Sequence, residues 1–239
     1  SADKAVMAVG HPGFWSGEAT SLTSIRIPAI QQELIREVDQ SGKPLILVLL
    51  NGRPLDLSWE STVADAIVEA WYPGTEGGHA VADVLSGDFN PCGKLTMTFP
   101  RNLGQVPIHY DAKNTGRPYT PGQGEQHYVS RYLNEPTATP LYPFGYGLGY
   151  GKAELSSVSV GLDGCDVTVS VEVENTGETY PVQEVVQVYC SRPDSGKTGA
   201  AWFLDTFQKT QVLAPGESQT LHLRFPVTEL ALFRKSALA

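Results

Sequence analysis

The sequence has little positive charge and no basic cluster. Its 17 lysines and arginines are scattered among 26 aspartates and glutamates, which leaves a formal net charge of −9. Nucleic acids and anionic membranes are bound largely through clustered positive charge, so neither is expected as a partner. Long hydrophobic runs are also missing. The longest, residues 45–50, has the length of a buried strand and is too short to cross a bilayer.

Residues that form disulfides or metal sites are scarce as well. The three cysteines, Cys92, Cys165 and Cys190, are far apart and odd in number. This predicts separate thiols and leaves a Cys165–Cys190 bridge as the less favoured alternative. The five histidines are scattered without the spacing of metal ligands, so no metal site is predicted.

An alternation of strand-like and helix-like segments fills residues 1–101. The stretch 4–9 and the unbroken apolar run 45–50 predict strands, the second buried on both faces as in a parallel sheet. Apolar residues recur on one helical face from Ile30 to Val38, after Pro28, and predict a helix. Two further elements follow: a helix that opens in the glycine-rich segment 74–78 and closes at Gly87, and a strand over 94–99. This rhythm predicts an α/β layered domain.

The remainder of the chain changes character twice. Residues 102–150 lack periodicity and are rich in proline, glycine and tyrosine. A connection of this length is usually functional or wraps another domain, and its aromatic side chains argue against a flexible linker. Later, alternate valines from Val167 to Val173 are separated by polar residues, and further short strands and turns follow. This pattern predicts a β-sandwich over residues 151–239.

Five segments together carry a resemblance to a known family. They are Gly42–Leu50, Asn51–Leu55, Trp71–Gly78, Asn90–Leu95 and Tyr142–Leu148. In order and spacing they resemble glycoside hydrolase family 3, in particular its bacterial periplasmic β-glucosidase branch, which also carries a loop like Asn114–Tyr119. Glycine-rich turns are common singly, but five of them in one order are highly specific. The resemblance covers nearly the whole chain.

This resemblance implies the last two parts of a three-part enzyme. In the family a TIM-like barrel precedes an α/β sandwich, and a fibronectin type III-like domain often follows. The implied fold class is an α/β sandwich domain over 1–101, followed after a long aromatic-rich connecting loop over 102–150 by an all-β fibronectin type III-like (immunoglobulin-like) sandwich over 151–239. That last domain is expected to lack its closing strand, because family members continue further beyond Phe233. The N-terminal barrel is absent from the chain and becomes an expected partner. A periplasmic or extracellular location is implied, and the sequence also allows a cytoplasmic one.

The resemblance also points to one carboxylate. The family commonly places its general acid/base glutamate on a loop near the start of the sandwich domain, in a Ser-Gly-Glu-like context, and Ser16-Gly17-Glu18 matches it. Glu18 is the candidate acid/base, whereas composition alone would make it a solvated surface residue. A retaining glycosidase needs two carboxyl groups about 5 Å apart, and the nucleophile is implied to lie on the barrel. Two carboxylates suffice for this chemistry, so no cofactor is expected.

Four aromatic or basic residues are candidates for substrate contacts. Phe14 and Trp15 precede Glu18 and could stack on a sugar ring, or could instead pack the loop onto its own domain. Arg117 and Tyr119 lie on the long loop and could approach the aglycone, or could make structural hydrogen bonds.

Two departures from the family pattern bear on activity. An arginine usually stands where this chain has Leu22, and Gly-Glu is usual where it has Gly10-His11. Loss of the arginine is expected to alter sugar contacts or the position of the loop.

The sequence therefore predicts the C-terminal part of a retaining β-glucosidase-type enzyme. The whole enzyme would hydrolyse terminal non-reducing β-D-glycosyl residues of β-glucosides or oligosaccharides, with glucose and xylose both open as the sugar. The chain alone is expected to be inactive, because it lacks the nucleophile. The alternative is a non-catalytic fragment that binds carbohydrate or a partner domain.

Overall fold

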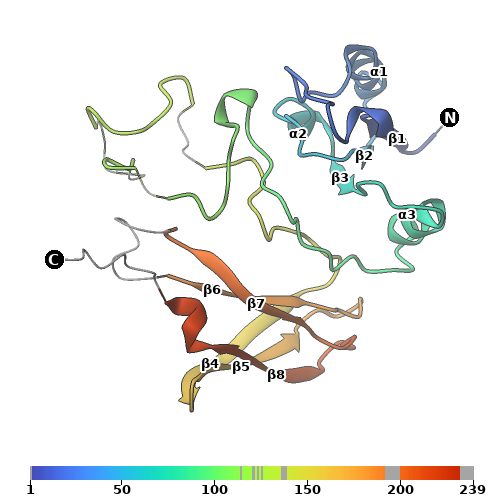
Figure 1. Cartoon of the computed structure of the whole chain (residues 1–239). Coiled ribbons are helices and arrows are strands. Elements are labelled where there is room, and N and C mark those ends of the chain that lie inside the picture. Colours follow the sequence, from blue (N-terminus) through green and yellow to red (C-terminus); the bar gives the residue numbers. More distant parts are fainter. Residues whose placement is uncertain are drawn as a thin grey trace. The chain divides into compact units, whose positions relative to one another are not determined.

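The computed structural model of the chain describes residues 2–113, 115–119, 122, 124, 126–135, 139–191 and 200–231 (Figure 1). The chain divides into two compact units. The first unit consists of Ser1–Asp88, Thr96–His109 and Thr139–Phe144, and the second of Phe89–Leu95, Tyr110–Ala138 and Gly145–Ala239. The domain boundaries expected at residues 101 and 150 stay predictions. The expected loss of a closing strand concerns residues 232–239, which lie outside the described residues.

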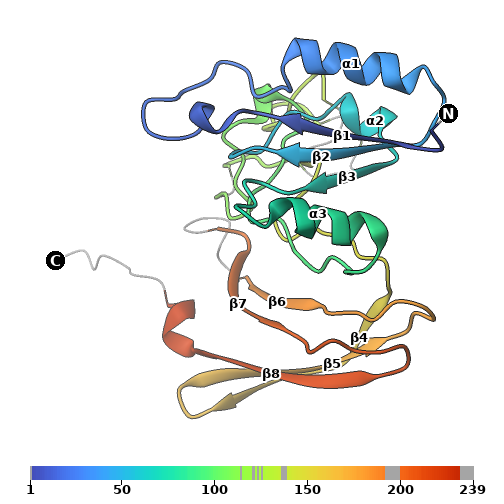
Figure 2. The same ribbon diagram turned by 90° about the vertical axis from the view of Figure 1, so that its right-hand side faces the viewer.

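The first unit is built on a small parallel sheet. Its strands are β1 (Ala5–Gly10), β2 (Leu45–Leu50) and β3 (Ala66–Glu69), paired in the order β1-β2-β3. The central strand is the most apolar, and its residues Leu45, Leu47 and Leu49 are completely buried. The parallel pairing confirms the prediction made for this run. Figure 2 shows the three arrowheads at one edge of the sheet, where the loop of residues 11–24 begins.

Helices and short turns connect these strands. They are α1 (Ala29–Asp39), α2 (Glu60–Val63), α3 (Gly77–Ser86) and the 3-10 turns η1 (Gly13–Trp15) and η2 (Leu103–Gln105). α1 begins directly after Pro28, where a missing N–H costs nothing, and buries Ile35 from its apolar face. Gln31 of α1 exchanges two hydrogen bonds with the backbone of Gly10, at 2.8 and 3.2 Å, which fixes the helix to the end of β1. α3 ends at Gly87, whose φ of 86° lies in the left-handed region that favours glycine.

The second unit contains an antiparallel β-sandwich. One sheet has the order β4-β5-β8, and the other pairs β6 with β7 (Figure 2). The bounds are β4 (Ala153–Asp163), β5 (Asp166–Asn175), β6 (Val185–Cys190), β7 (Phe203–Lys209) and β8 (Ser218–Pro226), followed by the 3-10 turn η3 (Val227–Leu230). The alternating valines of β5 lie opposite Leu221, Leu223 and Phe225 of β8, and with Val186 and Leu213 they form the core. The predicted alternation is therefore the inner face of this sandwich.

The prediction of a strand over residues 94–99 is wrong, because the structure has no strand there. Its backbone makes only scattered pairs: Leu95 donates to Tyr146 O and accepts from Gly145 N, and Phe99 forms an isolated bridge with Tyr142. Pro143 stands between these points and has no N–H to continue a ladder. Apolar alternation alone could not reveal that the opposite segment is unsuited to pairing.

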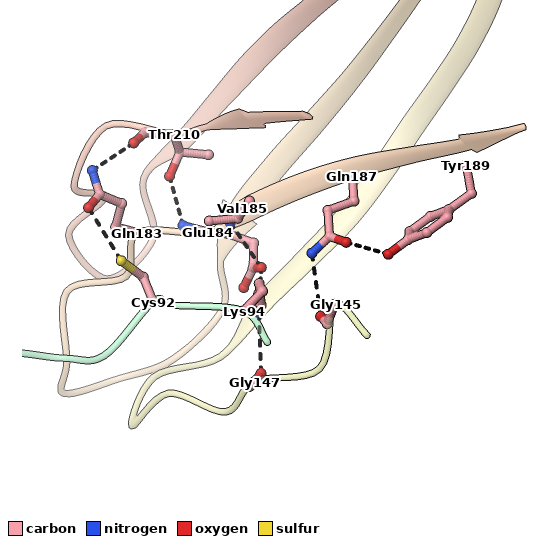
Figure 3. A network of polar contacts seen from close by, with 10 residues as sticks. All are labelled: Cys92, Lys94, Gly145, Gly147, Gln183, Glu184, Val185, Gln187, Tyr189 and Thr210. Carbon is pink, nitrogen blue, oxygen red and sulfur yellow. Dashed lines mark hydrogen bonds and ion pairs between the residues drawn. The ribbon is translucent and has the colours of Figure 1, made fainter. Parts of the chain in front are cut away.

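A polar network joins segments that lie far apart in the sequence to the sandwich (Figure 3). The Lys94 ammonium pairs with Glu184 at 2.8 Å and donates to Gly147 O at 3.2 Å. Both side chains of this ion pair are about four-fifths buried, at 18% and 22% exposed. Gln187 donates to Gly145 O at 3.4 Å in the same way. Parts of the expected connecting loop thus pack on β6 instead of remaining free.

Two further observations complete the fold. The alternative Cys165–Cys190 disulfide is not formed. Cys92 is a buried thiol and Cys165 an exposed one. No helix within the described ranges is long and apolar enough to cross a membrane.

The same substitution is predicted to have unequal effects at two paired sheet positions, Val160 and Val169. They lie directly across from each other on β4 and β5, but Val160 is 71% exposed and Val169 only 8%. We expect Val169→Ala to lower the free energy of unfolding by roughly 2 kcal/mol, because it leaves a cavity in the core. Val160→Ala should lower it by less than about 0.5 kcal/mol. Urea unfolding of the whole chain measures both, and equal losses would contradict the exposed position of β4.

Candidate active site

Glu18 lies on the loop of residues 11–24, called the Glu18 loop below. The loop leaves the carboxyl end of β1 and leads to α1 (Figure 2). In open α/β sheets, ligands bind in the crevice outside the carboxyl ends of the strands. The Glu18 side chain is exposed at this edge. Its position therefore suits a group that acts on a molecule approaching from outside the unit.

The backbone on both sides of Glu18 adopts uncommon conformations. Gly17 has a φ of 147° and Ala19 a φ of 59°, both in regions that side chains with a Cβ rarely adopt. For Ala19 this costs roughly 1–2 kcal/mol, which the surrounding contacts must offset. One such contact is the Thr20 hydroxyl, which donates to Gly17 O at 2.6 Å and closes the turn around Glu18.

Arg53 holds the loop from the end of the neighbouring strand β2. Its Nη2 donates to the carbonyls of Trp15 and Thr20, the latter at 3.1 Å. These two carbonyls stand on either side of Glu18 in the sequence, so one guanidinium bridges the turn that carries it. A planar, permanently charged group with several donors suits this task better than a lysine.

Tyr72, which follows β3, supports the start of the loop. Its hydroxyl lies 3.3 Å from the carbonyls of His11 and Pro12 and 3.3 Å from Ser16 Oγ. Gly52 passes close beneath, because an added Cβ would stand 2.6 Å from Ser16 Oγ and 2.7 Å from the Tyr72 ring. The ends of all three strands thus contribute to holding the loop.

His11 is a buried part of the same support. It is only 3% exposed, and its Nε2 donates to Arg26 O at 2.9 Å. Because a carbonyl can only accept, Nε2 carries the proton, and Nδ1 is buried without a hydrogen-bond partner among the described residues. The Trp15 ring packs edge-on against the imidazole with 5.0 Å between the ring centroids.

Glu69, the last residue of β3, is a further carboxylate at this edge. Its Oε1 accepts from the Trp71 N–H at 2.8 Å and its Oε2 from Asn51 Nδ2 at 3.2 Å. Burial raises the pKa of Glu69 to about 7, although both hydrogen bonds lower it. Glu69 is not among the site residues predicted from the sequence. Asn51 follows the predicted strand 45–50 directly, but no strand was predicted over residues 66–69, so the sequence did not mark Glu69 as a neighbour of Asn51.

The comparison with family models decides the identity of this arrangement. Residues 1–150 match the glycosyl hydrolase family 3 C-terminal domain, and residues 184–238 match a fibronectin type III-like domain. The chain belongs to glycoside hydrolase family 3. Its fold is accordingly the α/β sandwich of that family followed by a fibronectin type III-like domain, as the sequence predicted.

Individual relatives of this family 3 chain agree with the match. It is 47% identical to the "Periplasmic beta-glucosidase" of Salmonella typhimurium over 97% of its length, and 38% identical to the "Beta-xylosidase" of Formosa agariphila over 98%. A crystal structure of β-glucosidase from Listeria innocua in complex with isofagomine superposes with a TM-score of 0.88 over 95% of the chain, at 40% identity. The chain spans 30%, 32% and 32% of the length of these three proteins.

The remaining predicted residues of the family 3 chain divide between the two units. Phe14 and Trp15 lie on the Glu18 loop, but Phe14 is 78% exposed whereas Trp15 is partly buried against His11. Arg117 and Tyr119 belong to the second unit, where Arg117 O accepts a hydrogen bond from Ser130 N at 2.9 Å. Arg117 is exposed and Tyr119 partly buried. Among the described residues, no group of three or more histidine, cysteine, aspartate or glutamate side chains could hold a metal ion.

Proposed function

We propose that this chain supplies the acid/base half of a retaining β-glycosidase active site, with Glu18 as the general acid/base. The observation that carries the proposal is the exposed Glu18 carboxylate on a loop whose backbone is held by Arg53 on both sides. The relatives named beta-glucosidase and beta-xylosidase support it, as does the Listeria innocua structure with the sugar mimic isofagomine.

The chemistry requires a second carboxylate from outside this chain. In a double displacement that carboxylate attacks the anomeric carbon, while Glu18 gives its proton to the departing glycosidic oxygen. Glu18, now ionised, then removes a proton from the water that attacks the glycosyl-enzyme. A nearby anionic nucleophile favours the protonated form of such an acid. A TIM-like barrel, which the family resemblance implies, would supply this nucleophile. The chain spans 30% of the length of the Salmonella typhimurium relative, which is consistent with a further domain in that relative.

The substrate contacts are assigned by exposure and position. Phe14 is exposed beside Glu18, so it can stack on the apolar face of a β-glucoside or oligosaccharide. Trp15 would support it from below through its contact with His11. Arg117 and Tyr119 remain the residues predicted from the sequence to contact the leaving group. The proposal includes a periplasmic or extracellular location, which the relative named periplasmic β-glucosidase supports.

Complementation tests the proposal. We expect the chain alone to hydrolyse neither 4-nitrophenyl β-glucoside nor the β-xyloside, because the proposed nucleophile belongs to the barrel. Mixing with a separately produced barrel domain of a family 3 relative should restore hydrolysis. The sugar that reacts then identifies the substrate class. Turnover by the chain alone would contradict the proposal, and binding of β-glucosides without turnover in the mixture would favour a non-catalytic carbohydrate-binding role.

A further inference from the structure

A continuous chain of hydrogen bonds connects the end of β3 to the Glu18 loop. Glu69 accepts from Asn51 Nδ2 at 3.2 Å, and the same Nδ2 donates to Arg53 O at 2.9 Å. Arg53 in turn donates from Nη2 to Trp15 O and Thr20 O. These contacts link Glu69, which has no role in the proposed chemistry, to the Glu18 loop, which does have one.

Asn51 is the central residue of this chain of contacts, because its amide contacts both Glu69 and Arg53. It is completely buried, so its amide cannot exchange partners with water. Both hydrogens of Nδ2 are used, one toward Glu69 and one toward the Arg53 carbonyl. Its Oδ1 is buried without a hydrogen-bond partner among the described residues. This orientation of the amide suits an ionised Glu69, which can only accept.

A protonated Glu69 would favour the opposite orientation. Its Oε1 still accepts from Trp71 N–H, so Oε2 becomes the hydroxyl and needs an acceptor. The unpartnered Asn51 Oδ1 can accept this hydrogen, and rotating the amide by half a turn would present it. That rotation removes Nδ2 from Arg53 O and so releases the segment whose side chain holds the Glu18 loop.

We propose that the ionised Glu69 is a positioning residue for the Glu18 loop, acting through Asn51 and Arg53. In calling the loop catalytic, the proposal rests on the function proposed above. Glu69 does not touch the substrate. It selects the orientation of the Asn51 amide in which Nδ2 donates to Arg53 O. In that orientation the Arg53 backbone is fixed, and its side chain fixes the turn around Glu18.

The ionisation of Glu69 is set by burial and not by a charged neighbour. The ionisable side chains that stand first after the three strands are His11, Arg53 and Tyr72. Each makes its hydrogen bonds elsewhere: His11 to Arg26 O, Arg53 to the loop carbonyls, and Tyr72 to Ser16 and the start of the loop. Asp56, further along after β2, is buried and pairs with Arg26 at 3.2 Å. Glu18 itself is exposed on the loop. Desolvation raises the pKa of Glu69 to about 7. The loop is therefore expected to be fixed above this pH and looser below it.

Nuclear magnetic resonance of the whole chain tests this coupling without any substitution. With glutamate labelled at the carboxyl carbon, the Glu69 signal should titrate near pH 7, and the backbone amides of Gly17, Ala19 and Thr20 should shift with the same midpoint. Loop amides that do not follow the Glu69 titration would overturn the proposal.

Glu69→Gln provides the second arm. With its amide oxygen on the Trp71 N–H, the N–H₂ of the glutamine would face Asn51 Nδ2, so we expect Asn51 to rotate as it does beside a protonated Glu69. The loop amides of the variant should therefore match those of the wild type at low pH and lose the titration near pH 7. Glu60→Gln is the matched control, because Glu60 is also buried in the first unit, at 1% exposed, but accepts from Gln32 Nε2. It should keep the titration of the loop. A loop that still titrates in Glu69→Gln would overturn the proposal.

Activity after complementation separates this inference from the proposed function. We expect Glu69→Gln to lower kcat about 10-fold with a smaller change in KM, because a displaced acid/base affects the chemical step more than binding. If Glu18→Gln leaves activity intact but the loop still follows Glu69, the catalytic proposal fails and the positioning role stands. If Glu18→Gln abolishes activity while the loop ignores Glu69, the positioning role fails alone.

Discussion

Glu18→Gln is expected to lower the kcat of the complemented enzyme by about 10²- to 10⁴-fold toward substrates with poor leaving groups. This is the usual contribution of one general acid/base. Glutamine keeps the size and the hydrogen-bonding shape of the side chain but carries no transferable proton. Since Glu18 is exposed and Arg53 contacts only the loop backbone, the substitution should leave the fold unchanged.

The choice of substrate distinguishes an acid/base from a binding residue. An activated aryl glycoside, such as the 2,4-dinitrophenyl derivative, needs no proton at its leaving oxygen, so its first step should be nearly normal in Glu18→Gln. The glycosyl-enzyme should then accumulate, because no base activates water. Azide needs no base and should restore turnover with formation of a glycosyl azide. Glu76→Gln is a suitable control, since Glu76 is an exposed glutamate in the same unit. Equal effects of both substitutions, or no rescue by azide, would contradict the role of Glu18.

Gly10→Ala is expected to destabilise the first unit by roughly 2–5 kcal/mol. Gly10 ends β1 with a φ of 137°, and an added Cβ would stand 2.2 Å from Leu50 O of the paired strand. Because the clashing atom is backbone, β1 and β2 must separate at the point where the Glu18 loop begins. Gln31 would also lose its two hydrogen bonds to the Gly10 backbone.

Gly42→Ala is the matched control for this effect. Gly42 also has a positive φ, of 65°, but nothing lies within 4 Å of an added Cβ. It should cost only the roughly 1–2 kcal/mol of the left-handed conformation. Trp15, Trp59 and Trp71 belong to the first unit, so urea unfolding followed by tryptophan fluorescence reports mainly on it. Similar losses for the two variants would show that conformation and not collision decides the cost.

Local patterns predicted several elements correctly. The apolar run 45–50 is β2, and the valine alternation from Val167 to Val173 is the inner face of β5. β2 is buried along most of its length and β5 along one face, so the periodicity of their side chains reports the structure directly. The helix predicted from Ile30 to Val38 lies in α1, but of its apolar face only Ile35 is fully buried, whereas Ile30 and Leu34 are 73% and 56% exposed.

Elements that have no buried face, or whose pairing depends on a distant segment, were missed or wrongly predicted. β4 is exposed at nearly all of its positions, so its sequence shows no inner face. The segment 94–99 alternates like a strand, but the facing segment contains Pro143 and pairs only at isolated points. Whether a strand forms depends on its partner, and the partner lies far away in the sequence.

The family, the order of an α/β sandwich before a fibronectin type III-like domain, and Glu18 as the candidate acid/base could all be predicted from the amino-acid sequence. These predictions follow from motifs and periodicities that are contiguous along the chain. The contacts that hold Glu18 in place become visible only in the folded chain. Arg53, Tyr72, Asn51 and Glu69 come from the ends of strands that are separate in sequence, and parallel pairing of β1, β2 and β3 brings those ends to one edge of the sheet. The ionisation of Glu69 likewise depends on burial, which exists only once these strands have packed.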